Sequence, residues 1–159
     1  MKIESNFSDL EKNFDKKGFR NFLDMKESFR DSTGVKGNPL IYKVYTRNFG
    51  TFQMTLTVLE SGKVKGEFFM TKGHKHKNPR EEIYFLVSGK GKLLIEGKTS
   101  NSIEMKEGKF YTIPKGVGHR AVNTGRKKFK FVSIYSRDAG HDYNFKFKKR
   151  FFEKEKRKK

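Results

Sequence analysis

The sequence predicts an all-β protein, folded as an antiparallel β-barrel or jelly roll with a short N-terminal extension. From Leu40 onward the chain consists of short runs rich in Val, Ile, Phe, Tyr and Thr, the residues most enriched in strands. Gly, Pro or Asn separates one run from the next, and no helical periodicity lies between them. Eight such runs at close spacing favour a barrel or a jelly roll over a mixed α/β fold.

The predicted strands follow these runs along the chain. They cover residues 40–46, 52–59, 67–71, 82–87, 92–96, 102–105, 110–113 and 129–135. We therefore expect residues 40–145 to form the barrel as a single domain, because 159 residues suit one hydrophobic core. The 17 Phe residues are expected to supply much of the volume of that core.

Residues 1–39 are expected to form an N-terminal extension with a short helix and an edge strand. Ser8 precedes Glu11 by three residues, the spacing of a capping box, and Gly18 is expected to end the helix that follows. Residues 34–39 contain Gly, Asn and Pro and predict a loop. The Phe residues of the extension could cover an exposed sheet edge.

Composition excludes several classes of site. The chain has no Cys, so a disulfide, a thiolate nucleophile and a Cys-based zinc site are all excluded. No apolar stretch approaches the length of a membrane span, and the charged N-terminus is unlike a secretory signal. We expect a cytoplasmic protein that is not bound to a membrane.

The net charge of +19 suggests an anionic partner. The excess charge is spread along the chain and is densest in the basic C-terminal tail, residues 146–159, which carries +7 and whose last seven residues are expected to fray. No motif of a specific nucleic-acid reader is present, so we expect no specific nucleic-acid partner. The tail is predicted to be dispensable for turnover and to carry much of any polyanion binding.

Two sequence blocks hold the residues that could perform chemistry. In the first, His74 and His76 are two positions apart, so both imidazoles project from one face of a strand. Glu82 shares a strand face with Tyr84 and Leu86, although alternation alone does not say which face is the inner one. The second block brings His119 just after a Pro-containing loop.

The spacing of these blocks resembles the paired motifs of the cupins. The first block places Gly73, His74, His76, Glu82 and Gly89 in the order of the first cupin motif, with slightly more residues than usual between His76 and Glu82. The second block matches its motif without a gap, at Gly108, Pro114, Gly116, His119 and Asn123. The resemblance implies a cupin jelly roll.

Further segments narrow the resemblance to one branch of the cupins. Residues 57–64, 67–76, 89–91, 114–123 and 134–143 are together similar to the archaeal-type cupin phosphoglucose isomerases. The resemblance covers about residues 19–145. The A-G-H-D-Y run at the end of the last segment is not a general cupin feature, so it carries most of this narrower assignment.

The resemblance implies a metal held by four side chains, His74, His76, Glu82 and His119. It implies one divalent ion per subunit, with Fe²⁺ as the first expectation and Mn²⁺, Ni²⁺, Co²⁺ or Zn²⁺ as alternatives. Three imidazoles and one carboxylate suit all of these ions, so affinity alone does not choose among them. An octahedral ion with four protein ligands would keep two positions for substrate oxygens.

The resemblance also assigns roles around the metal. A sugar phosphate would be held by Thr57, Thr71, Gly73 and Tyr135, and the sugar itself by Tyr84, His141 and Tyr143. Glu82 and His141 are the expected catalytic residues. The family commonly has an aromatic pair where this chain has Gly116 and Val117, so one wall of the pocket is expected to be more open.

These assignments imply an isomerase that interconverts glucose 6-phosphate and fructose 6-phosphate in glycolysis and gluconeogenesis, and that acts as a homodimer. A nonenzymatic sugar-binding cupin and a cupin dioxygenase are the alternatives, because one fold hosts many activities. Proton transfer by Glu82 and a metal-assisted hydride shift both remain open as mechanisms. The Thr and Tyr residues are also compatible with ordinary strand positions.

Overall fold

Antiparallel strands dominate the computed structural model, which describes residues 5–154. In chain order the strands are β1 (Lys16–Asn21), β2 (Leu40–Phe49), β3 (Phe52–Leu59), β4 (Lys63–Val64), β5 (Glu67–Phe68), β6 (Lys75–His76), β7 (Glu82–Ser88), β8 (Gly91–Glu96), β9 (Ser100–Glu104), β10 (Phe110–Ile113), β11 (Gly118–Asn123), β12 (Phe129–Ser136) and β13 (His141–Asp142). Each of the eight predicted strand runs overlaps one of these strands.

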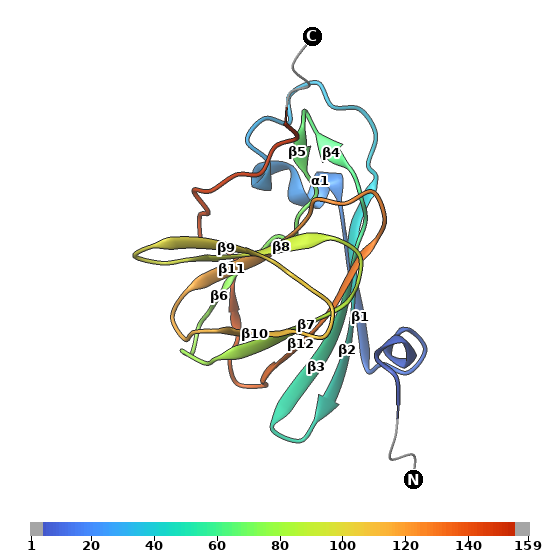
Figure 1. The fold of residues 1–159 in the computed structure, drawn as a ribbon, viewed down its shortest axis with the longest axis vertical. Coiled ribbons are helices and arrows are strands. Elements are labelled where there is room, and N and C mark those ends of the chain that lie inside the picture. The colour runs from blue at the N-terminus through green and yellow to red at the C-terminus, as the bar shows by residue number, and fades with distance from the viewer. Residues whose placement is uncertain (1–4, 155–159) are drawn as a thin grey trace.

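Two sheets face each other across the core (Figure 1). The larger sheet has the strand order β1-β2-β3-β12-β7-β10, and the smaller has the order β11-β8-β9. Two short pairs, β13-β6 and β4-β5, and three isolated bridges, Glu67 to Phe152, Met70 to Val122 and His74 to His119, complete the pairing among the described residues. Neighbouring strands are antiparallel throughout this part of the chain, which confirms the predicted all-β jelly-roll class.

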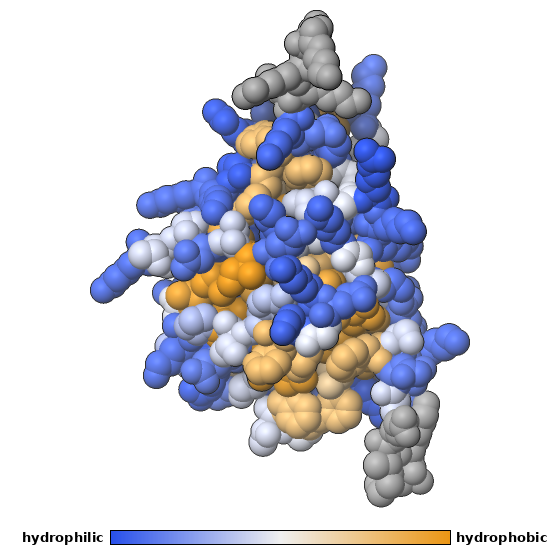
Figure 2. All heavy atoms as spheres, in the orientation of Figure 1, coloured by the Kyte–Doolittle hydropathy of each residue, from blue (hydrophilic) through white to orange (hydrophobic). Residues whose placement is uncertain are grey.

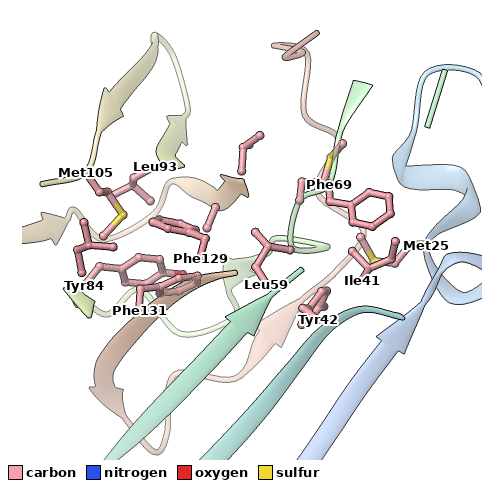
Figure 3. Packing of buried hydrophobic residues seen from close by; sticks show 14 of the residues in the cluster. Met25, Ile41, Tyr42, Leu59, Phe69, Tyr84, Leu93, Met105, Phe129 and Phe131 are labelled. Atoms are coloured by element: carbon pink, nitrogen blue, oxygen red, sulfur yellow. The ribbon is translucent and has the colours of Figure 1, made fainter. Parts of the chain in front are cut away.

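The main hydrophobic core lies between the two sheets. Leu93 and Ala121 from the smaller sheet pack in one buried cluster with Leu86 and Phe131 from the larger sheet. Figure 3 shows Leu93 and Met105 close to Tyr84, Phe129 and Phe131, with Met25, Ile41 and Phe69 at the other end of the cluster. Aromatic rings bury more apolar area per residue than aliphatic side chains, so the Phe-rich composition fills this core.

A second cluster covers part of the opposite, outer face of the larger sheet. Leu10 packs there with Tyr45, Leu56, Val58 and Val132. Leu10 belongs to the 3₁₀ helix η1 (Phe7–Glu11), which therefore packs on this face and covers part of it. The other helical turns are α1 (Phe22–Met25) and η2 (Lys26–Ser28). Within residues 5–154, no helix has the length and hydropathy needed to cross a membrane.

Two details of the predicted N-terminal helix are wrong. Ser8 does not open the helix; Asn6 precedes it, and the Asn6 backbone N–H donates to the Asp9 carboxylate at 3.1 Å. The carboxylate three residues after the cap satisfies this N–H, so the capping box lies two residues earlier than the sequence suggested. Gly18 does not end the helix either. It lies within β1, at the edge of the larger sheet, where it pairs with Val44.

The described part of the basic tail, residues 146–154, packs against the barrel. The backbone N–H groups of Lys148 and Lys149 donate to the buried Glu96 carboxylate at 2.6 and 3.1 Å. Arg150 approaches the Glu67 carboxylate at 3.3 Å, and that carboxylate also accepts the Arg30 N–H at 2.7 Å. The fraying expected for the last seven residues falls mainly on residues 155–159, which lie outside the described residues.

These contacts predict that a chain ending at Phe147 is less stable than one ending at Glu153. The shorter chain leaves the carboxylates of Glu67 and Glu96, which are 1% and 4% exposed, without their partners from the tail. We expect the free energy of unfolding to fall by roughly 2–5 kcal/mol, because unpaired buried charges are costly. Urea unfolding of both chains measures the difference, and equal midpoints would show that the tail contacts do not stabilise the fold.

Candidate metal centre and cavity

A backbone bridge brings together the two sequence blocks that carry the candidate ligands. The His74 N–H donates to the His119 carbonyl at 3.1 Å, and the His119 N–H donates to the His74 carbonyl at 2.9 Å. His76 follows on β6, while Glu82 opens β7 and lies between Tyr135 of β12 and Ile113 of β10. Segments 45 residues apart in the sequence thus meet at one point of the inner face.

The four candidate ligands converge on a single point. One ligand atom from each of His74, His76, Glu82 and His119 lies within 4.8 Å of all the others. The Glu82 Oε2 atom is 2.8 Å from His119 Nε2, 3.2 Å from His76 Nε2 and 3.9 Å from His74 Nε2. The four residues that the sequence singled out as ligands therefore lie together in space. His76 belongs to β6, Glu82 to β7 and His119 to β11, and His74 forms the bridge to His119.

The cluster has the chemistry that a divalent cation requires. Glu82 Oε2 and the Nε2 atoms of the three histidines are buried and have no hydrogen-bond partner among the described residues. Buried polar atoms are nearly always paired, so four converging ligand atoms without hydrogen-bond partners fit coordination to a cation. Nitrogen and carboxylate oxygen are common ligands of transition metals. The residues present thus fit a metal ion.

A hydrogen bond to the Arg80 backbone fixes the orientation of the His76 ring. Its Nδ1 atom lies 2.9 Å from the Arg80 carbonyl oxygen, so Nδ1 carries the proton and Nε2 presents a lone pair to the cluster. Arg80 is in turn held by Asp138 through two hydrogen bonds of 3.1 and 2.6 Å. The loop between His76 and Glu82 is therefore tied to the turn after β12.

The ionisation of Glu82 and His74 also suits metal binding. Burial and the neighbouring His119 lower the pKa of His74 to about 2, so its imidazole is neutral near neutral pH. Burial alone would raise the pKa of the Glu82 carboxyl, but the histidines around it hold that pKa well below its usual range. For His76, burial is outweighed by Glu82 and the Arg80 carbonyl, which raise its pKa. A carboxylate and a neutral His74 imidazole are the forms that bind metals.

A cavity of the inner face opens directly onto this cluster. Its lining includes three of the four cluster residues, with His76 lying behind them at 4% exposure. The lining also includes every other residue that the sequence singled out, namely Thr57, Thr71, Gly73, Tyr84, Tyr135, His141 and Tyr143. Gly116 and Val117 are not part of the lining and lie in the loop before β11, so the more open wall expected at these positions stays a prediction.

His141 and Tyr143 close one side of the cavity. The His141 ring lies 3.9 Å from the His74 ring, centre to centre, and its Nδ1 atom is 3.1 Å from the Tyr143 hydroxyl. Strand β13, which carries His141, pairs with β6, so His141 lies directly opposite His76. The fourth histidine of the chain thus joins the cluster without being one of its four converging ligands.

Sequence reasoning missed several lining residues. Tyr42, Val44, Thr55, Phe131 and Ser133 also face the cavity, and the Thr55 and Ser133 hydroxyls hydrogen-bond at 2.6 Å on its floor. Strand alternation could have found them once the inner face was known. Thr57 pairs with Val44 on one side and Phe131 on the other, and side chains of directly paired residues share a face.

Comparison with protein families and curated proteins gives consistent matches. The profile of the family described as "Glucose-6-phosphate isomerase (GPI)" matches residues 2–152. A glucose-6-phosphate isomerase from Thermococcus litoralis is 42% identical over 140 residues, which cover 80% of this chain and 74% of that protein. One from Thermococcus onnurineus is 40% identical over 139 residues, with the same shares of the two chains covered.

Comparison with solved structures shows the fold. An oxalate oxidase in complex with the substrate analogue glycolate has a TM-score of 0.55 and 19% identity, covering 73% of this chain and 63% of the other. The oxalate decarboxylase of Lactobacillus farciminis, as a formate complex, has a TM-score of 0.54 and 18% identity, covering 64% of this chain and 30% of the other. These likenesses confirm the cupin fold that the motifs predicted.

The backbone conformation at Gly73 and the close packing around it predict that Gly73→Ala is destabilising. Gly73 has φ +72°, and a Cβ placed there would lie 2.7 Å from the Phe147 ring, 2.8 Å from Arg120 Cβ and 2.8 Å from the His119 carbonyl oxygen. We expect Gly73→Ala to lower the free energy of unfolding by roughly 3 kcal/mol or more and to reduce metal content, because it crowds the bridge between His74 and His119.

The matched control is Gly108→Ala. Gly108 also has φ +72°, but a Cβ there would meet no atom within 4 Å, so only the backbone strain of about 1–2 kcal/mol is expected. Chemical denaturation and metal analysis of both variants separate crowding from strain. If the two variants lost equal stability and kept equal metal, the close packing around Gly73 would have no role in the site.

Proposed function

Since this chain belongs to the glucose-6-phosphate isomerase (GPI) family, we propose that it interconverts glucose 6-phosphate and fructose 6-phosphate as a cytoplasmic enzyme of glycolysis and gluconeogenesis. The observation that carries the proposal is the cluster of His74, His76, Glu82 and His119 at the base of a cavity lined by hydroxyl groups. A sugar phosphate needs these two features together: a Lewis-acid site for its carbonyl end, and hydroxyl and backbone donors for its other oxygens.

We assign one divalent ion per subunit to the four ligands, with Fe²⁺ as the expected ion and Mn²⁺, Ni²⁺, Co²⁺ or Zn²⁺ as alternatives. When bound, such an ion supplies Lewis acidity that stabilises negative charge developing on a carbonyl oxygen. His76 is the best-oriented ligand, because the Arg80 carbonyl fixes which of its nitrogens faces the cluster. His74 and His119 are held at a fixed spacing by their mutual backbone hydrogen bonds.

The chain's own residues would then handle protons and position the sugar. Glu82 is an ionised carboxylate at the base of the cavity, so it can take a proton from C2 of the open-chain sugar and return one to C1. A hydride shift between the same carbons remains the alternative. His141, with its Nδ1 atom beside the Tyr143 hydroxyl, is placed to move a proton at the ring oxygen or a sugar hydroxyl.

The phosphate and the sugar hydroxyls would contact the remaining lining residues. We assign the phosphate to the hydroxyls of Thr57, Thr71 and Tyr135 and to the backbone at Gly73. Thr71 already accepts the Ala121 N–H at 3.0 Å, which orients its hydroxyl hydrogen toward another acceptor. Tyr84 and Tyr143 would line the sugar. Burial raises the pKa of Tyr84 and Tyr135 further above neutrality, so both phenols stay protonated and can donate to oxygen atoms.

We further propose that the enzyme is a homodimer formed through the outer face of the larger sheet. Large aromatic side chains are exposed there, including Phe110 at 64% and Phe52 at 41%, and Phe110 also contacts Phe85. Figure 2 shows apolar side chains gathered on the lower part of the visible face, where Figure 1 places β3, β7, β10 and β12. Exposed apolar patches of this kind are typical of subunit interfaces.

Light scattering at micromolar concentration is expected to give twice the chain mass for the wild-type protein. Phe110→Ser should shift the mass toward the monomer, because it removes the most exposed of these rings. A wild-type monomer would contradict the proposed dimer.

The activity is tested by a coupled assay for glucose 6-phosphate formed from fructose 6-phosphate. We expect turnover by the metal-loaded protein, loss of turnover after treatment with a chelator, and recovery when Fe²⁺ or another divalent ion is added back. A protein that binds fructose 6-phosphate without turning it over would favour a nonenzymatic sugar-binding cupin. Metal-dependent consumption of O₂ in place of isomerisation would favour a dioxygenase.

Two variants separate the roles within the metal cluster. Glu82→Gln keeps an oxygen ligand but loses the base, so kcat should fall by roughly 10²–10⁴-fold while metal content falls much less. His74→Ala should lose metal and activity together, and excess metal should restore part of both. Metal content and rate are measured on the same samples. A metal-loaded Glu82→Gln protein within a few-fold of the wild-type rate would exclude Glu82 as the base.

A further inference from the structure

A second hollow lies beside the candidate active-site cavity, at the free edge of the larger sheet. The two spaces adjoin each other, since Tyr42, Val44, Tyr135, His141 and Tyr143 line both of them. The hollow extends over β1 and is completed by Lys16, Gly18, Phe19, Arg20, Thr46 and Gln53. None of the assigned metal, catalytic or substrate roles uses these added residues.

Strand pairing places two cations of β1 on the same face as the active site. Arg20 pairs with Tyr42, Gly18 with Val44, and Lys16 with Thr46. Val44 pairs in turn with Thr57, so the row that begins on β1 runs onto the floor of the cavity. Directly paired side chains share a face, and therefore Lys16 and Arg20 extend the inner face at its edge.

Gly18 leaves open space between these two cations. A Cβ at Gly18 would meet no atom within 4 Å, and Lys16 and Arg20 lie two positions away on either side along the same strand face. The missing side chain therefore forms part of the hollow. Its floor is lined by the Tyr42 and Val44 side chains from the adjacent strand.

The hollow is positively charged and its cations are not neutralised. Its lining, as far as the described residues form it, contains no Asp or Glu. Arg20 donates to the carbonyl of its neighbour Phe19 at 3.0 Å, and no carboxylate within residues 5–154 forms an ion pair with it. Lys72 adds a third cation nearby, with its Nζ atom 5.6 Å from the centre of the Tyr143 ring.

The electrostatic influence of Arg20 extends to the boundary between the two spaces. Burial raises the pKa of Tyr42 to about 12 and also raises that of Tyr143, and in both cases the Arg20 guanidinium opposes the rise. Tyr42 and Tyr143 line both the hollow and the cavity. An anion near these two tyrosines would therefore be attracted by Arg20.

We propose that Lys16 and Arg20 form a cationic vestibule that captures the phosphorylated sugar and selects it over uncharged sugars. This inference rests on the proposed isomerase function and adds two specificity-determining residues to it. The substrate class it requires is a sugar that carries a dianionic phosphate. Uncompensated charge at the mouth of a site raises the local concentration of an oppositely charged ligand and speeds its association.

The test compares Arg20→Gln, Arg20→Lys and the double variant Lys16→Gln/Arg20→Gln with the wild-type enzyme. At low ionic strength we expect Arg20→Gln to lower kcat/KM for fructose 6-phosphate by about five- to tenfold and the double variant to lower it further. We expect kcat to change less than about twofold and Arg20→Lys to retain most of the wild-type value. In 0.5 M salt the differences should shrink to about twofold or less, because exposed charges are screened.

The matched control is Lys98→Gln, which makes the same change in charge at an exposed residue of the β8–β9 turn, on the opposite side of the molecule from β1 (Figure 1). It should leave kcat/KM and its salt dependence unchanged. An equal loss in Lys98→Gln and Arg20→Gln would overturn the vestibule, because net charge alone would then explain the effect.

A binding measurement keeps this inference separate from the proposed activity. Calorimetry on metal-loaded protein gives the Kd of sorbitol 6-phosphate and of uncharged sorbitol. We expect the double variant to raise the Kd of sorbitol 6-phosphate about tenfold and to leave the Kd of sorbitol unchanged. Equal Kd values for sorbitol 6-phosphate in the wild-type protein and the double variant would overturn the vestibule. A wild-type protein without turnover would instead contradict the proposed isomerase function, whatever the calorimetry showed.

Discussion

The burial of one carboxylate among three imidazoles is the constraint on which the rest of the structure depends. Glu82 is 2% exposed and His119 is 1% exposed, so water cannot satisfy their polar atoms. Removing a charge from water is costly unless the protein supplies partners. The strand order places Glu82 between two other strands and opposite the bridge of His74 and His119. The pairing of the strands therefore holds the four ligand atoms close together.

Metal binding and folding must be coupled in such an arrangement. The converging Nε2 and Oε2 atoms lack hydrogen-bond partners among the described residues, so a cation that satisfies them stabilises the folded chain over the unfolded one. Other contacts position the ligands without being ligands themselves. Backbone hydrogen bonds join His74 to His119, and residues outside the cluster hold His76. The Arg80 carbonyl orients His76, and Asp138 holds Arg80 from the turn after β12. Affinity for a metal at this site would thus depend also on residues outside the cluster.

Much of the fold and site could be predicted from the sequence because both depend on local patterns. Short β-rich runs give the strands, and the resemblance of two sequence blocks to the paired cupin motifs gives the cluster of His74, His76, Glu82 and His119. The failures have physical reasons. Gly18 resembles a helix stop but lies in an edge strand, because pairing with β2 outweighs its low strand propensity. Tyr42, Thr55 and Ser133 carry no motif, and only the pairing of strands places them in the cavity.

The packing of Phe147 on Gly73 has a consequence for the order in which the protein matures. Phe147 is buried, lies against the backbone beside His74, and stacks under the Arg120 guanidinium at 4.0 Å. The ribosome adds Phe147 after all four ligands have already been made. The segment that braces the bridge between His74 and His119 therefore arrives later than the ligands themselves. A nascent chain that exposes His74, His76, Glu82 and His119 still lacks this brace, so tight metal capture is expected to follow the synthesis of the ligands rather than accompany it.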